Sequence, residues 1–235
     1  LLEKINEKIE LLEELKKGYL QQMFPAKGET APLIRFNGYS EPWVERTFDE
    51  MGKYKKGPFG SNLKKSDFVS KENGSIKVYE QQNAIKKNWK LERYFITKEF
   101  SKKLRAFEVN EGDIIVSCAG TIGEMYVLPP NSEPGIINQA LMRIRTDKSI
   151  NKYFFQLLFD RMIDRFSREK SNGSAIKNIP PFKDLKPMIA LTPNYSEQNQ
   201  ISKFIKSFDK LVMIHQLEFD SIKKLKTGYM QRLFA

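Results

Sequence analysis

Three stretches of the chain combine lysine with amide or hydroxyl side chains, a mixture suited to binding nucleic acid. They surround the turn Gly57-Pro-Phe-Gly60, follow an apolar segment that ends at Tyr79, and precede Pro180. Asn, Gln and Ser side chains bond base edges, whereas Lys binds phosphate oxygens. The candidates expected near bases are Gln81, Gln82, Asn83 and Ser174, and the others are Lys55, Lys56, Ser61, Asn62, Lys64, Lys65, Lys86, Lys87, Lys170, Asn172, Lys177 and Asn178.

A further group of candidates surrounds Gly120-Thr-Ile-Gly123, in which Thr121 lies between two glycines. Such a turn can bring its backbone close to a phosphate, or it can be a hairpin turn that needs glycine for its conformation. Both interpretations remain open for Thr121 and for Asn138 and Gln139, which follow the next apolar segment.

The charge distribution also indicates a polyanionic partner. The 235 residues include 40 Lys and Arg against 29 Asp and Glu, a net charge of +11. Most of this excess falls between residues 25 and 195, whereas the terminal segments are nearly balanced. A basic domain between nearly neutral ends predicts binding of nucleic acid by the domain and of proteins by the ends.

Catalytic and metal-binding functions find little support. The chain has one cysteine, Cys118, and one histidine, His215, and it has no Gly-x4-Gly-Lys-Ser/Thr motif. Asn178-Ile-Pro-Pro-Phe182 resembles the Asn-Pro-Pro-Phe of adenine methyltransferases, but Ile179 interrupts it and no glycine-rich turn for S-adenosylmethionine precedes it. We therefore expect a chain that is not an enzyme and holds no metal or cofactor of its own. A single cysteine and no apolar run of ~18 residues favour a cytoplasmic protein without membrane segments.

The elements that position these residues begin and end with two copies of one motif, at 12–24 and 222–234. The copies share Leu15/Leu225, Lys16/Lys226, Gly18/Gly228, Tyr19/Tyr229, Gln21/Gln231 and Phe24/Phe234. Apolar residues recur every three to four positions through both copies, which is typical of a coiled-coil seam. The predicted seam consists of Leu2, Ile5, Ile9, Leu12, Tyr19, Val212, His215, Phe219, Ile222 and Tyr229.

These patterns predict a helix over 1–24, stopped by Pro25, and a final helix capped by Ser196 and running to Phe234. Their lengths would be about 36 and 58 Å at ~1.5 Å per residue. Between them, residues 25–195 would form the nucleic-acid-binding domain, and 196–235 the C-terminal helix.

Within the domain, alternation and turn residues predict strands at 76–79, 93–97 and 188–192, a hairpin around Gly120 and Gly123, and a further strand at 136–145. A broad apolar face predicts a helix from Tyr153 to Lys170, stopped at Asn172-Gly173. The fold class is therefore α+β, a twisted and mostly antiparallel sheet with helices, flanked by terminal helices that pair as an antiparallel coiled coil.

Several motifs follow one another along the chain in one order. They are Leu-Lys-Lys-Gly-Tyr-Leu-Gln-Gln-Met-Phe at 15–24, Gly57-Pro-Phe-Gly-Ser-Asn-Leu-Lys-Lys-Ser-Asp-Phe68, Gly112-Asp-Ile-Ile-Val-Ser117, Gly120-Thr-Ile-Gly123, Ile137-Asn-Gln139 and Ser196-Glu-Gln-Asn-Gln-Ile201. Over essentially its whole length the chain thus resembles the specificity subunit of type I restriction-modification enzymes, matching one target recognition domain with both flanking helices.

The resemblance implies a non-catalytic subunit that recognises double-stranded DNA. It implies methyltransferase (modification) subunits that dock on the helices and bring S-adenosylmethionine, and a restriction subunit that brings ATP- and Mg²⁺-dependent translocation and cleavage. The chain opens in mid-heptad and has no counterpart of 196–210 before Leu1, so we expect a fragment of a longer subunit or a natural half subunit. A half subunit would form a homodimer that reads a symmetric split site, and the helices would pair within one chain or between two.

A function of another class is the alternative. The chain would then be a coiled-coil adaptor whose basic domain binds an acidic protein.

Overall fold

The computed structural model describes residues 1–170 and 179–233, which belong to two units. One unit consists of Leu1–Glu45 and Leu191–Ala235, and the other of Arg46–Ala190. The expected domain boundaries were residues 24 and 195, so the structure differs by assigning the connector after the first helix to the helical unit.

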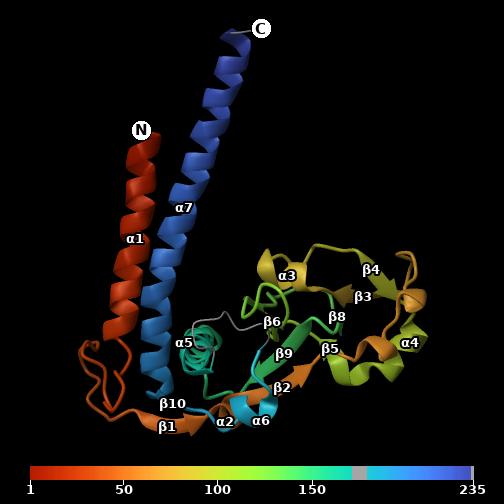
Figure 1. Ribbon diagram of the computed structural model, residues 1–235, viewed down its shortest axis with the longest axis horizontal. Coiled ribbons are helices and arrows are strands. Elements are labelled where there is room, and N and C mark those ends of the chain that lie inside the picture. Colours follow the sequence, from red (N-terminus) through yellow and green to blue (C-terminus); the bar gives the residue numbers. More distant parts are fainter. Residues whose placement is uncertain (171–178, 234–235) are drawn as a thin grey trace. The chain divides into compact units, whose positions relative to one another are not determined.

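In the helical unit, α1 (Leu2–Gln22) and α7 (Tyr195–Leu233) lie side by side and antiparallel (Figure 1). With 39 residues, α7 is about 58 Å long, as expected from the sequence. The Tyr19 ring meets the Phe204 ring edge to face, with centroids 4.9 Å apart, and Lys16 Nζ lies 2.5 Å from Asp209 Oδ1. The first copy of the repeated motif is therefore packed on the first turns of α7.

The start of α7 differs from the prediction by one residue, and its cap is not Ser196. Asn194 Oδ1 accepts a hydrogen bond from the Glu197 backbone N–H at 3.0 Å, which is the bond of an N-cap residue. The Ser196 hydroxyl instead lies 2.9 Å from the Tyr39 hydroxyl. Asn194 and Ser196 both have cap chemistry, so residue type alone could not decide between them.

The connector packs on the helices through aromatic and charged contacts. The Phe24 and Trp43 rings meet edge to face at 5.7 Å. Arg35 donates two hydrogen bonds to the buried Glu197 carboxylate, at 2.9 and 2.7 Å. This bidentate pair raises the pKa of the Arg35 guanidinium and ties the connector to the first turn of α7.

The other unit contains two four-stranded sheets. In the first, β2 (Gly52–Lys56), β9 (Leu141–Thr146), β6 (Ile114–Ser117) and β7 (Met125–Val127) are neighbours in that order and antiparallel. The predicted hairpin around Gly120 and Gly123 is confirmed as β6–β7. Lys55 and Lys56, which the sequence placed in a loop, are paired strand residues of β2.

The second sheet has the order β4 (Tyr94–Ile96), β3 (Ile76–Tyr79), β8 (Gly135–Ile137) and β5 (Glu108–Val109). Its β3–β8 pair is parallel and the others are antiparallel. The single strand predicted over 136–145 is wrong, because the chain turns at Asn138 and passes from β8 in this sheet to β9 in the other.

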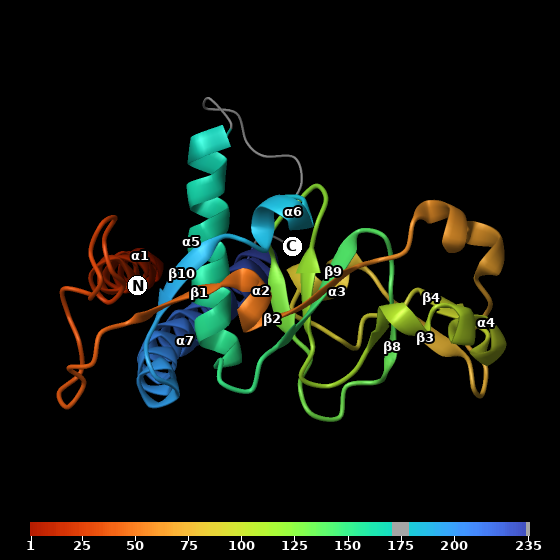
Figure 2. The ribbon, with the colours of Figure 1, turned by 90° about the horizontal axis from the view of Figure 1, so that it is seen from below.

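A further pair of strands, β1 (Val44–Thr47) and β10 (Ile189–Thr192), forms a two-stranded sheet. β10 confirms the strand predicted at 188–192, and α5 (Lys152–Lys170) confirms the helix predicted from Tyr153. Its expected stop at Asn172-Gly173 lies outside the described residues. α5 and α4 (Lys98–Lys103) lie at opposite ends of the unit Arg46–Ala190, which we call the recognition unit (Figure 2). The remaining helices are α2 (Phe48–Met51), α3 (Gln81–Ile85), α4 (Lys98–Lys103) and α6 (Phe182–Leu185), with 3-10 turns η1 (Gly60–Asn62), η2 (Lys65–Asp67) and η3 (Arg105–Phe107).

A buried cation lies in the core of this unit. Val78 and Tyr79 of β3 enter two neighbouring apolar clusters, which explains why β3 is apolar on both faces. Lys77, on the same face of β3 as Tyr79, is fully buried, with its Nζ donating to the Trp89 carbonyl and lying 4.9 Å from the Tyr79 ring centroid. Burial lowers the pKa of the Lys77 amine. No helix in the described part of the chain is both long and apolar enough to span a membrane.

Candidate nucleic-acid interface

Three turns and one helix end meet at one place on the recognition unit, which we call the recognition face. It consists of Lys56–Gly57 at the end of β2, Ala119–Thr121 between β6 and β7, Asn138–Ala140 between β8 and β9, and Gln81 at the start of α3. All four segments include or adjoin residues that the sequence singled out, although they lie far apart in the chain.

Gly57 connects the turn after β2 to the turn between β8 and β9. Its backbone N–H donates to the Leu141 carbonyl at 2.8 Å. A Cβ atom built on Gly57 would lie 1.9 Å from the Asn138 carbonyl oxygen, a distance that no side chain can occupy. Glycine at this position therefore lets the Gly57 turn and the Asn138 turn press against each other.

The turn between β6 and β7 also contacts the Asn138 turn. Gly120 and Gly123 have φ angles of +66° and +84°, which favour glycine, so the hairpin interpretation is correct at least for the backbone. The Cys118 N–H donates to the Ala140 carbonyl at 2.8 Å and connects this turn to the Asn138 turn. Thr121 and Gln139 are exposed at the two tips.

Gln81 holds the β6–β7 turn from the other side. Its Nε2 donates to the Ala119 carbonyl and, at 3.3 Å, to the Thr121 carbonyl. The amide expected near a base is thus committed to the protein, and its effect on recognition would be to position Thr121. Gln82, the next residue, is exposed.

Asn83 has a structural position. Its Oδ1 accepts the Glu80 N–H at 2.8 Å, and its Nδ2 donates to the carbonyls of Asn88 and Leu91 at 3.0 and 2.9 Å. The side chain is buried, with 2% of the residue exposed. A base contact by Asn83 would require these bonds to break, so the structure does not favour the role that the sequence suggested.

The predicted lysines differ in their surroundings. Lys56, Lys64, Lys65 and Lys86 are exposed, whereas Lys87 Nζ pairs with Glu124 Oε2 at 2.6 Å. Lys55 is half-buried, with its Nζ 4.9 Å from the Phe107 ring centroid. Ser61 and Asn62 are exposed on η1. The third stretch, with Asn172, Ser174, Lys177 and Asn178, lies outside the described residues, as does the side chain of Lys170.

One side chain of this region was missed by the sequence reasoning. Phe59 is 82% exposed, although aromatic side chains are usually at least half buried. Its neighbours Pro58 and Leu63 are both buried. The Gly-Pro-Phe-Gly spacing predicted a tight turn, but it gave no sign that the proline would face inward and the phenylalanine outward.

Nucleophilic chemistry at Cys118 is disfavoured. The residue is 2% exposed, and burial raises the pKa of its thiol to about 12, although the nearby Lys56 charge acts in the opposite direction. A thiol that stays protonated near neutral pH is a poor nucleophile. Within the described residues, no group of three or more His, Cys, Asp or Glu side chains is placed to hold a metal ion.

The residues of the predicted seam are at least partly buried, except at its C-terminal end. Ile5 and Ile9 are buried, and Leu2, Leu12, Tyr19, Val212, His215, Phe219 and Ile222 are partly buried. Tyr229 is 65% exposed, so it takes no part in the seam in this structure. The second copy of the motif is therefore exposed where the first is packed.

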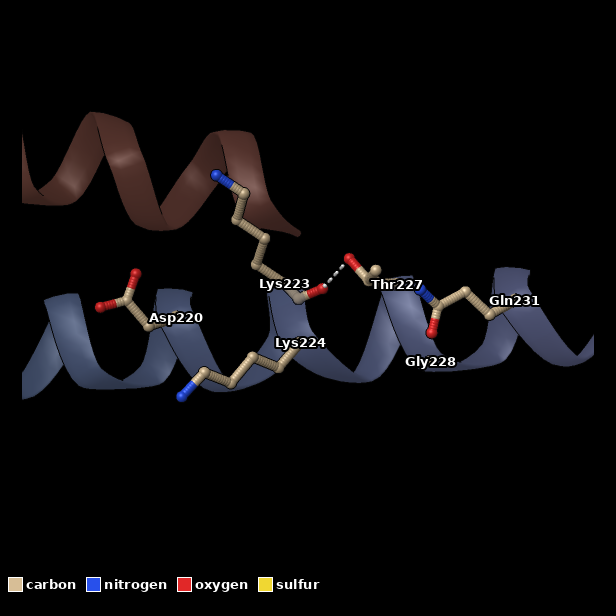
Figure 3. A pocket seen from close by; sticks show the side chains of 6 residues that line it. All are labelled: Asp220, Lys223, Lys224, Thr227, Gly228 and Gln231. Carbon is tan, nitrogen blue, oxygen red and sulfur yellow. Dashed lines mark hydrogen bonds between the residues drawn. The ribbon is translucent and has the colours of Figure 1, made fainter.

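A shallow hollow on α7 belongs to this second copy. Figure 3 shows its lining residues, which all come from α7 itself. Thr227 Oγ1 donates to the Lys223 carbonyl at 3.0 Å, as a helix side chain commonly does. A hollow bounded by one helix encloses little, and it offers no binding site comparable to the recognition face. Its residues are Asp220, Lys223, Lys224, Thr227, Gly228 and Gln231.

Comparison with known families decides the assignment. The family model described as the type I restriction modification DNA specificity domain matches residues 40–224. The chain belongs to this family. The match covers the whole recognition unit and most of α7, and it confirms the resemblance found in the sequence.

Solved structures agree with the specificity-domain fold. A chain from a study of complex assembly and conformational transition of the type I R-M system aligns with a TM-score of 0.63 and 17% identity, covering 100% of this chain and 56% of that one. The HsdS subunit from Thermoanaerobacter tengcongensis aligns with a TM-score of 0.65 and 15% identity, covering 98% and 52%. The S subunit from M. genitalium aligns with a TM-score of 0.56 and 13% identity, covering 97% and 55%.

The specificity domain and its helices thus span about half the length of these solved chains. At these identities the likeness concerns the fold, and it confirms the predicted α+β class. A search of curated protein sequences found no match.

Proposed function

We propose that this chain recognises a short sequence in double-stranded DNA and directs methyltransferase and restriction subunits to a bipartite site. The observation that carries the proposal is the recognition face, where turns distant in sequence are pinned together by the Gly57, Cys118 and Gln81 contacts. Rigid turns that present polar side chains and exposed lysines are what sequence reading requires, because base contacts depend on position and phosphate contacts on charge.

The helices support a spacer and docking function. α1 exposes Leu11 and Leu15, and α7 exposes Leu211, Ile214 and Leu217. Apolar side chains along an exposed helix pair favour a helical partner, and the methyltransferase subunits are the partners proposed here. Those subunits would bring S-adenosylmethionine, and the restriction subunit would bring ATP and Mg²⁺, so this chain needs none of them.

The length of α7 is comparable to the distance between two half-sites on one DNA duplex. About 58 Å corresponds to between one and two turns of duplex at ~34 Å per turn. A second recognition domain would come from another part of a longer chain or from a second copy of this one. In the second case the exposed Tyr229 end would contribute to a homodimer.

Duplex binding at two salt concentrations tests the proposal. Fluorescence anisotropy of a random duplex should show affinity that falls steeply with salt, because each phosphate contact releases counterions. An adaptor that binds acidic proteins would show no such dependence. Methylation mapping of cells with and without the gene then identifies the sequence, and unchanged methylation in the two would contradict the directing role.

A further inference from the structure

The loop that carries Phe59 is anchored at both ends and exposed at its tip. Pro58 is buried on one side of Phe59, and Leu63 enters an apolar cluster on the other. The Asn62 N–H donates to the Phe59 carbonyl at 2.8 Å, which closes η1. Gly57 is held against Asn138 as described above. The exposed ring is therefore presented by a fixed backbone rather than by a free segment.

Gly60 next to the ring gives a second observation. A Cβ atom built on Gly60 meets no heavy atom within 4 Å among the residues described, and no left-handed φ requires glycine there. The fold would accept a larger residue at this position. A glycine that the fold does not need leaves room for a partner to approach the backbone closely.

The charge around the tip indicates which partner this is. From Gly52 to Ser66 the chain has no acidic residue, and its lysines are Lys53, Lys55, Lys56, Lys64 and Lys65. An exposed aromatic ring among cations suits a polyanion whose surface also offers stacked rings, as that of DNA does. In DNA, phosphates surround the stacked bases, and proteins insert apolar side chains such as Phe between base steps.

We propose that Phe59 inserts its ring at a base step of the recognised duplex, with Lys64 and Lys65 on the adjacent phosphates. The inference rests on the proposed DNA-recognition function and adds an apolar contact to it. Ser61 and Asn62 on the same turn would then lie beside the opened step, where their hydroxyl and amide groups meet base edges. The step favoured for insertion is a flexible pyrimidine–purine step, since it unstacks most easily.

The test uses the full chain, alone and with its methyltransferase partner, on a duplex selected from random sequence by the unaltered protein. Phe59→Ala should lower affinity for the selected duplex roughly 5- to 100-fold, the range expected for loss of one aromatic–base contact. Affinity for random duplex should fall less than about threefold, and the salt slope should stay unchanged because no phosphate contact is lost. Phe59→Leu should retain part of the affinity, because leucine can also act as a wedge.

A fluorescent adenine analogue placed at successive positions reports unstacking directly. The unaltered protein should raise its emission at one step, and Phe59→Ala should abolish that rise. Leu33→Ala is the matched control, because Leu33 is 85% exposed but lies in the connector. Gly60→Val should also weaken binding to the selected duplex, without changing thermal stability.

The outcomes separate the two proposals. If the unaltered protein binds no duplex in a salt-dependent way, the proposed function itself is wrong. If it binds and Phe59→Ala binds the selected duplex equally well, the proposed insertion of Phe59 is wrong, whereas the proposed DNA recognition is retained. Weaker binding of the methyltransferase by Phe59→Ala, with DNA affinity unchanged, would assign the ring to a protein contact and would also overturn the inference.

Discussion

Gln81 and Thr121 are 40 residues apart in the sequence, yet Gln81 Nε2 donates to the Thr121 carbonyl at 3.3 Å. The same nitrogen donates to the carbonyl of Ala119. One amide at the start of α3 therefore fixes the turn between β6 and β7. Thr121 is exposed at that turn, so its position on the recognition face depends on α3 through the Gln81 side chain.

Gln81→Ala should loosen this turn. Loss of one partly buried and one exposed hydrogen bond should lower the free energy of unfolding by about 1–2 kcal/mol. The ratio of the affinity for the selected duplex to that for random duplex should fall. The affinity for random duplex itself should change less. Urea denaturation and competition binding measure the two effects. Gln82→Ala is the control, since Gln82 is exposed, and an equal loss in both variants would contradict a positioning role for Gln81.

Neutralising Lys64 and Lys65 should weaken binding to all duplexes alike. If both contact phosphate, the slope of log affinity against log salt becomes shallower by ~0.9 for each lost contact. Anisotropy titrations at four salt concentrations measure the slope. Lys17→Gln with Lys27→Gln removes the same charge from the helical unit, and the lysine assignment fails if both double variants change the slope equally.

The two copies of the helix motif provide a matched pair of tyrosines. Tyr19 packs on Phe204 and Phe208, with ring centroids 4.9 and 5.7 Å away, whereas Tyr229 is 65% exposed. Tyr19→Ala should cost about 2 kcal/mol in unfolding free energy, and Tyr229→Ala less than about 0.5 kcal/mol. Thermal unfolding should be followed at a concentration where the chain is monomeric. A cost for Tyr229→Ala that appears only at high concentration would support the homodimer, whereas equal costs in the monomer would contradict the structure.

Because of Cys118, the free energy of unfolding should depend on pH in the alkaline range. Burial raises the pKa of its thiol to about 12, whereas a thiol in an unfolded chain ionises near pH ~8.5. The folded state therefore binds this proton more tightly. The contribution is fully present below about pH 8.5 and is lost as the pH rises toward 12. The unfolding free energy of the unaltered chain should fall more steeply between pH 8 and 10 than that of Cys118→Ala, and parallel curves would contradict this.

The elements with strong apolar periodicity were predictable from the sequence. α5 and α7 are long and amphipathic, and β3 and β6 are short apolar runs next to turn residues. Periodicity could not divide residues 136–145, because β8 and β9 are apolar on either side of Asn138 and only the contact with Gly57 shows where the chain turns. α3 was not predicted, because its first turn is closed by the side-chain bonds of Asn83 and the helix has no long apolar face.

The sequence indicated which loops lie together, but not which side chains are bonded within the protein. The loops that the sequence singled out around Gly57, Thr121 and Asn138 do come together. Side-chain identity could not show that Gln81 and Asn83 bond to the protein, since an amide has the same donors and acceptors on a base and on a carbonyl. Phe59 was overlooked because phenylalanine is usually buried.

The close approach of Gly57 to Asn138 restricts how new specificities can be built. Each turn of the recognition face is shaped by its neighbour, so a loop transplanted alone from a relative would meet the wrong surface and lose its own geometry. Engineering should therefore exchange the Lys56–Gly60, Ala119–Gly123 and Asn138–Ala140 segments as one cassette. Natural diversification would face the same coupling, so new targets would arise more readily by recombining whole domains than by altering single loops.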